Sequence, residues 1–171
     1  YPNSAPVWEG NVWEDDGTPG VSSRGVSEDL PLDGARSLYG YTKLSAEQMI
    51  EEYRDTFGLK VAVNRCGVIA GPWQFGKVDQ GVVALRVMAH HFQRKLSYIG
   101  YGGTGKQVRD CLHVHDLADL ILEQVRDFDQ WEGWLGNVAG GLECSASLQE
   151  LTAICEEVTG NNIKIDSVAE N

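Results

Sequence analysis

The stretch Ser37-Leu38-Tyr39-Gly40-Tyr41-Thr42-Lys43-Leu44-Ser45-Ala46-Glu47 opens a segment with the periodicity of a long amphipathic helix. Serine is a favoured N-cap residue, so Ser37 is expected to cap the helix. Gly58 is expected to end it, because glycine adopts the left-handed C-cap conformation without steric cost. The apolar residues between these ends recur at helical spacing and are Tyr41, Leu44, Met49, Ile50, Tyr53 and Phe57.

Tyr39 and Lys43 lie four residues apart at the start of this helix. That spacing places two side chains on one helical face, about 5–6 Å apart at Cβ. A phenol is a weak proton acceptor at neutral pH, and a neighbouring ammonium favours its ionised form. The pair is therefore a candidate acid/base unit. The alternative is an ordinary helix start with a surface lysine, since this spacing alone is a weak signal.

Length and composition predict one globular domain. The 171 residues are 42% hydrophobic and 23% charged, as in ordinary globular proteins. The net charge of −11 argues against nucleic acid or an anionic membrane as a partner, although a small phosphorylated ligand needs only one or two cations. We find no apolar run of the ~20 residues needed for a membrane span and no leader segment, so a cytoplasmic protein is expected.

Cysteines and histidines give no metal-binding pattern. The four cysteines contain no Cys-x-x-Cys pair and are expected to be reduced, mostly buried thiols. His90 and His91, like His113 and His115, lack partners at ligand spacing, so no metal site is expected. His113 and His115 are expected to share one strand face as solvated side chains.

Residues 1–36 show no sustained period and contain Trp8 and Trp13, which favour an ordered, functional loop. Residues 37–171 are expected to form one domain in which helices alternate with short apolar strands. This order predicts an α/β fold with a parallel sheet. The expected strands are 59–66, 96–99, 107–114, 134–139 and 163–165. The expected helices after the first are 79–93, 117–125 capped by Asp116, and 148–158 between Ser147 and Gly160, with turn-rich loops at 67–76 and 100–105.

Four motifs, in order, resemble the extended short-chain dehydrogenase/reductase family of NAD-dependent epimerases and dehydratases. They are 27–32 followed by 37–43 and Glu47, then 64–72, then 105–110 with Val114 and Asp116, and finally 137–141 with 147–148. Together they cover nearly the whole chain from Ser27 onward. Within the family, residues 64–71 with 74–76 and 79–81 most resemble the CDP-paratose (CDP-tyvelose) 2-epimerases.

The resemblance implies a doubly wound, Rossmann-like parallel sheet that binds NAD, with a smaller lobe that binds a nucleotide-diphosphate sugar. Tyr39 would be the general acid/base, and Lys43 would hold the nicotinamide ribose and favour the phenolate. Cys66 and Val68, at the carboxyl end of their strand, would border the nicotinamide and the sugar, where open α/β sheets bind ligands.

The remaining implied residues concern the diphosphate. Arg109 would bind it with help from Asn137, and Asp79 and Gln80 would lie near the phosphates. Two alternatives stay open: Arg109 forms a surface ion pair with Asp110, and Asp79 is a helix cap. The family often has asparagine and a basic residue where this chain has Val68 and Gln80.

One family feature is missing from this sequence: the opening strand, glycine-rich turn and helix that receive the NAD pyrophosphate. The run 100–105 does not open a helix in the required way. The chain is therefore expected to correspond to the C-terminal part of the fold, with the dinucleotide-binding half absent. An exposed strand edge near 61–66 and an apolar helix face would follow, covered by a missing half or by a second copy.

Three functional interpretations remain. The first is an NAD-dependent nucleotide-diphosphate-sugar epimerase, present as a partial chain that is inactive alone. The second is a non-catalytic module that binds a nucleotide sugar or another subunit. The third is a nucleotide-sugar 4,6-dehydratase, which differs at positions upstream of this chain.

Overall fold

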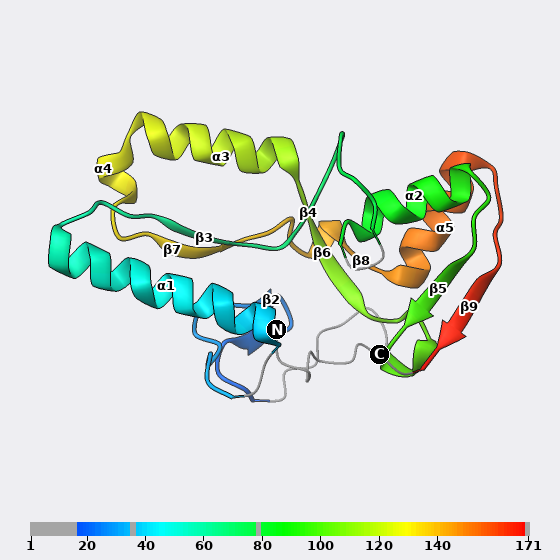
Figure 1. The fold of residues 1–171 in the computed structure, drawn as a ribbon, viewed down its shortest axis with the longest axis horizontal. Helices are drawn as coiled ribbons and strands as arrows, with labels where there is room; N and C mark the ends of the chain where they lie inside the picture. The colour runs from blue at the N-terminus through cyan, green and yellow to red at the C-terminus, as the bar shows by residue number, and fades with distance from the viewer. Residues whose placement is uncertain (1–16, 35–36, 78–79, 170–171) are drawn as a thin grey trace.

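The computed structural model describes residues 17–34, 37–77 and 80–169, which form an α/β fold (Figure 1). A short antiparallel hairpin, β1 (Val21–Ser22) and β2 (Gly25–Val26), precedes the first long helix. The helices are α1 (Leu38–Phe57), α2 (Val82–His91), α3 (Val114–Arg126), α4 (Phe128–Trp131) and α5 (Leu148–Thr159), with 3-10 turns η1 (Tyr101–Gly103) and η2 (Leu142–Cys144). The later strands are β3 (Val63–Cys66), β4 (Val68–Ala70), β5 (Leu96–Ile99), β6 (Val108–His113), β7 (Leu135–Val138), β8 (Ser145–Ser147) and β9 (Ile165–Val168).

Helix α1 has the caps that the sequence predicts. The Ser37 hydroxyl accepts a hydrogen bond from the Gly40 N–H at 3.1 Å, which satisfies one of the free amides of the first turn. At the other end Gly58 adopts φ 64°, and its N–H donates to the Arg54 carbonyl at 3.0 Å. Both predicted ends of this helix are confirmed.

Strands β3 and β7 pair in parallel, with Arg65 opposite Asn137 and Cys66 opposite Val138. Helix α1 lies on one side of this pair and α3 on the other (Figure 1). A reciprocal amide pair joins β3 to α3, because Asn64 and Gln124 each donate to the other at 2.8 and 2.9 Å. The carboxyl ends of β3 and β7 and the N-terminal end of α1 point to the same part of the molecule (Figure 1).

A second group of elements contains the buried core. Strands β4 and β6 pair in parallel, β6 and β8 pair antiparallel, and β5 and β9 pair in parallel. Among the described residues, the buried apolar side chains belong to α2, β6 and α5: Ala89, Leu112, Leu148, Leu151 and Cys155. Helix α5 starts with a capping box, in which the Ser147 hydroxyl accepts from the Glu150 N–H and the Glu150 carboxylate accepts from the Ser147 N–H.

The same core holds a buried arginine. Arg86 of α2 is 3% exposed, donates to the Thr152 hydroxyl at 3.0 Å and lies 5.0 Å from the centre of the Tyr98 ring. Burial lowers the pKa of its guanidinium. The stacked ring and the hydroxyl therefore compensate the charge in place of a carboxylate.

Two predicted elements differ near Gly67. The strand expected over 59–66 is regular only from Val63, and the loop expected over 67–76 contains β4. The Gly67 N–H still donates to the Val138 carbonyl at 2.8 Å, after which the chain leaves β7 and pairs with β6. The apolar residues of 59–70 do not reveal this change of partner strand, because pairing with β7 and pairing with β6 bury the same residue types.

Three further boundaries differ from the prediction. Helix α3 begins at Val114 with His113 as its N-cap, not at Leu117 after Asp116, because the His113 ring accepts from the His115 N–H at 3.3 Å. His113 therefore ends β6 while His115 begins α3, so the prediction that they share a strand face is wrong; both are exposed. Helix α2 begins at Val82 with Gly81 as its cap, and the last strand is β9, two residues later than expected.

The four cysteines are free thiols, of which Cys155 is buried, Cys66 and Cys111 are half-buried and Cys144 is exposed. The described parts of the chain contain no group of three or more His, Cys, Asp or Glu side chains arranged to hold a metal ion. In the same residues, none of the helices combines the length and the hydropathy required to cross a bilayer.

Candidate active site

The structure brings Tyr39 and Lys43 together at the start of α1. The Lys43 Nζ lies 5.3 Å from the centre of the Tyr39 ring. The tyrosine side chain is 62% exposed, so its hydroxyl is accessible to a ligand. The four-residue spacing thus places the Lys43 ammonium beside the Tyr39 phenol on an exposed face of the helix, as the sequence predicts.

Hydrogen bonds hold the first turn around this pair. The Thr42 hydroxyl donates to the Tyr39 carbonyl at 2.7 Å, and the Tyr41 hydroxyl donates to the Gly34 carbonyl at 3.1 Å. The second contact ties the helix start to the loop that precedes it. Together with the Ser37 cap, these bonds reduce fraying where the candidate acid/base pair lies.

Cys66 and Val68 lie on two different strands, which corrects the expectation that one strand carries both. Cys66 ends β3, and Val68 begins β4 opposite Cys111 of β6. Both side chains are half-buried. Burial raises the pKa of the Cys66 thiol, so this group is uncharged at neutral pH, which does not suit a nucleophile.

Arg109 lies in β6 opposite Ala146 of β8 and is half-buried. Its Nη1 donates to the neighbouring Val108 carbonyl at 2.8 Å. The Asp110 carboxylate accepts instead from the Gly140 and Gly141 N–H groups, at 2.7 and 3.1 Å. Asp110 therefore fixes the loop after β7, which is a use of this residue that the sequence analysis missed.

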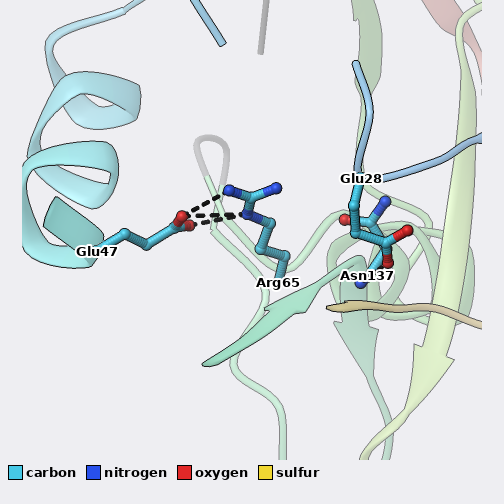
Figure 2. Close-up of polar contacts among 4 residues, drawn as sticks. All are labelled: Glu28, Glu47, Arg65 and Asn137. Atoms are coloured by element: carbon cyan, nitrogen blue, oxygen red, sulfur yellow. Dashed lines mark hydrogen bonds and ion pairs between the residues drawn. The ribbon is translucent and has the colours of Figure 1, made fainter. Parts of the chain in front are cut away.

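Asn137 lies near the end of β7 and contacts the loop after the β1–β2 hairpin. Its backbone N–H donates to the Glu28 carboxylate, which lies beside it in Figure 2. Its side-chain amide donates to the Val26 carbonyl at 3.2 Å. The first of these bonds, helped by the charge of Arg65, lowers the pKa of Glu28. The residues around Asn137 are thus held by a loop far away in sequence, which no local pattern predicts.

A two-point ion pair joins α1 to β3. The Arg65 guanidinium donates from Nε to Glu47 Oε1 at 3.0 Å and from Nη2 to Oε2 at 2.7 Å (Figure 2). The Glu47 carboxylate raises the pKa of Arg65. Both residues belong to the motifs quoted above, but neither was assigned a role. An acid one turn after Lys43 and an arginine within an apolar strand are the signals that could have revealed the pair.

The two other predicted diphosphate residues precede α2. Gln80 is exposed, and its carbonyl accepts from the Lys77 N–H at 2.8 Å. Asp79 lies outside the described residues. Of the two residues expected near the phosphates, the structure therefore describes only Gln80.

The described residues fit one end of an NAD molecule and not the other. Tyr39 and Lys43 present a hydroxyl and an ammonium from one exposed helical face, which suits a ribose beside a nicotinamide. The run Gly100–Gly105 contains the three-residue turn η1 and is followed by β6, so it offers no α-helix N-terminus to a pyrophosphate. Elsewhere in residues 17–34, 37–77 and 80–169, no glycine-rich turn links a buried strand to an α-helix in the required way.

Comparisons with known proteins agree with this architecture. Residues 15–134 match the NAD dependent epimerase/dehydratase family. CDP-paratose 2-epimerase from Salmonella typhi is 33% identical over 141 residues, which are 78% of this chain and 40% of that protein. The crystal structure of Pal from Bacillus thuringiensis superposes with a TM-score of 0.72 at 28% identity, over 94% of this chain and 47% of that one.

UDP-glucuronic acid 4-epimerase from Bacillus cereus, solved with UDP-glucuronic acid and NAD, superposes with a TM-score of 0.75. Its identity is 23%, over 91% of this chain and 46% of that one, so it supports the fold alone. The chain belongs to the NAD-dependent epimerase/dehydratase family of extended short-chain dehydrogenases/reductases. It spans less than half the length of each of these three proteins.

Proposed function

We propose that this chain supplies the nucleotide-sugar side and the acid/base pair of an NAD-dependent nucleotide-diphosphate-sugar epimerase. The observation that carries the proposal is the position of the Lys43 ammonium, 5.3 Å from the centre of the exposed Tyr39 ring. The family supplies the cofactor class, and the 33% identical relative from Salmonella typhi supports epimerisation. The chain corresponds to the C-terminal part of the family fold in this proposal.

Tyr39 has the central chemical task. Its phenolate takes the proton from a sugar hydroxyl as that carbon is oxidised, and its hydroxyl returns a proton when the carbon is reduced. Lys43 stabilises the phenolate between these two steps by its charge. The cofactor, when bound, supplies hydride removal and hydride return.

The other predicted residues bind and orient the substrate. Arg109 offers a guanidinium for the diphosphate, because its one hydrogen bond to a backbone carbonyl leaves donors for phosphate oxygens. Asn137 and Gln80 contribute polar contacts, and Asp79 is proposed to act beside Gln80. Cys66 and Val68 form uncharged walls that exclude water from the oxidised carbon.

A second function remains supported by one observation. The described residues hold no glycine-rich turn that leads from a strand into an α-helix, so this part of the chain offers no receptor for the NAD pyrophosphate. A non-catalytic nucleotide-sugar-binding module would need only Arg109 and its neighbours. A 4,6-dehydratase would use the same Tyr39 and Lys43, and loss of water from the product would distinguish it.

Isothermal titration of the purified chain tests these functions. We expect a CDP-sugar to bind and Arg109→Ala to weaken it roughly tenfold or more, which is the loss expected for a charge-assisted contact. Tyr39→Phe should leave this affinity nearly unchanged, because the hydroxyl acts in proton transfer. NAD binding by the chain favours the epimerase, whereas sugar-nucleotide binding without NAD fits both functions, because the described residues hold no receptor for the NAD pyrophosphate. Failure of CDP-, UDP- and dTDP-sugars alike to bind would refute both.

A further inference from the structure

We infer that Arg65 is a positioning residue, which holds Glu47 of α1 and faces Glu28 of the preceding loop so that Tyr39 and Lys43 are aimed at the strand ends. This inference rests on the proposed function of Tyr39 and Lys43. Neither Arg65 nor its two acidic neighbours would touch the sugar. They act through the orientation of the helix that carries the acid/base pair.

Glu47, which binds Arg65, lies on the same helix as Tyr39 and Lys43. Tyr39, Lys43 and Glu47 follow one another at intervals of four residues, so they lie on one helical face in successive turns. Glu47 is bound to Arg65, which precedes the last residue of β3. A rotation of α1 about its axis would break this contact and turn Tyr39 and Lys43 away together.

Packing does little to prevent such a rotation within this chain. None of the twenty residues of α1 is buried. Apolar side chains that normally fix the rotation of a helix, including Met49 and Phe57, are more than half exposed. The ion pair to Arg65 therefore has an unusually large share in setting the orientation of this helix.

The geometry and burial of the pair suit this role. The guanidinium uses two different nitrogens on two carboxylate oxygens, which fixes direction as well as distance. The side chains of Arg65 and Glu47 are 21% and 22% exposed. The pair Arg54–Glu51, one turn further along α1, is 41% and 57% exposed with a single 3.4 Å contact, and it is a matched control.

Glu28 extends the link to the other side of Arg65. Its carboxylate accepts from the Asn137 N–H, and Asn137 lies opposite Arg65 in the β3–β7 pair. Figure 2 shows the Arg65 guanidinium between the Glu47 side chain and the Glu28 side chain. Charge attraction to Arg65 contributes to holding the Glu28 loop over the ends of β3 and β7.

Residual dipolar couplings of the backbone amides give a test that needs no ligand, because they report how α1 is oriented and rotated against the β3–β7 pair. We expect Glu47→Gln and Arg65→Gln to change the couplings of α1 relative to those of β3 and β7, while Glu51→Gln leaves them unchanged. Glu47→Gln is nearly isosteric, so it is the variant least prone to unfold. Wild-type couplings of α1 in folded Glu47→Gln overturn the inference.

A charge exchange separates positioning from general stabilisation. Glu47→Arg combined with Arg65→Glu should recover the wild-type couplings of α1 at least in part, whereas either single change should lose them. Failure of the double variant to recover any of them, with circular dichroism showing a folded chain, counts against positioning. Binding of a CDP-sugar is measured on the same proteins. If the wild type binds none, the proposed function fails, while the couplings of α1 still decide the role of Arg65.

Discussion

Glu28 has two neighbours that favour its charged form, and this predicts an acid-dependent contribution to stability. The Asn137 N–H and the charge of Arg65 lower the pKa of this exposed carboxyl below its ordinary value of 4.5. A group with a depressed folded pKa stabilises the fold above its ordinary pKa and loses that contribution as pH falls through the depressed value.

We therefore expect Glu28→Gln to destabilise the chain slightly at neutral pH, and the difference from wild type to shrink as pH falls below 4.5 and through the depressed pKa of Glu28. Glutamine can still accept from the Asn137 N–H, so the comparison isolates the charge. Urea unfolding of both proteins at pH 7 and in acid measures it. A difference that stays constant across this range would contradict the assignment.

Arg109 allows binding and stability to be separated at a single residue. Its visible hydrogen bond goes to the adjacent Val108 carbonyl, and such a local contact adds little to folding. Arg109→Lys should keep part of the diphosphate affinity, because the charge remains while the two-point geometry is lost. Titration with a CDP-sugar together with thermal melting tests this. A fall in melting temperature that parallels the loss of affinity would instead make Arg109 a structural residue.

At the scale of elements, two serine caps make a controlled comparison. Ser37→Ala and Ser147→Ala each remove a hydroxyl that accepts an N–H in the first turn of a helix, so each should cost about 1 kcal/mol of unfolding free energy. Their effects on the site should differ. Only Ser37→Ala frays the turn that contains Tyr39, so only that variant should shift the carbon-13 NMR signal of dimethylated Lys43, which lies beside the Tyr39 ring. An equal shift in Ser147→Ala would mean that the Lys43 signal reports overall stability.

At the scale of the whole molecule, one face of α1 is apolar and uncovered. An open hollow of about 400 Å3 lies along it, lined by Ala46, Met49, Ile50, Tyr53, Leu59 and Val61. In the described part of the chain, β3 pairs with β7 and its other edge has no strand partner. An exposed apolar face beside an open parallel strand is typical of a surface that another chain or segment covers.

We expect the chain to elute larger than its 18.8 kDa mass at micromolar concentration, because self-association would bury this face. Met49→Glu should shift elution toward the monomer, and Met88→Glu on α2 is the control, since it lies away from the hollow. Gel filtration with light scattering provides the measurement. A well-behaved wild-type monomer with a cooperative melt would contradict the expectation.

Local signals predicted the helices better than the strands. Ser37, Gly58, Ser147 and Gly160 mark helix ends through caps that involve neighbours within a few residues, and all four are confirmed. The strand boundaries around Gly67 and the helix cap predicted at Asp116 were wrong. The strand boundaries depend on which distant segment pairs with β4, and an apolar run does not encode its partner. The observed cap is His113, which ends β6 and accepts from the His115 N–H.

The sequence by itself determined the alternation of helices and strands, the family and the shared helical face of Tyr39 and Lys43, because each depends on residue order and short-range spacing. Only the tertiary structure decided that Arg65 binds Glu47, that Glu28 reaches Asn137 from 109 residues away and that Cys66 and Val68 lie on separate strands. These contacts join segments with no fixed relation along the chain. Folding brings them together through the parallel pairing of β3 with β7, whose register sets Arg65 beside Asn137.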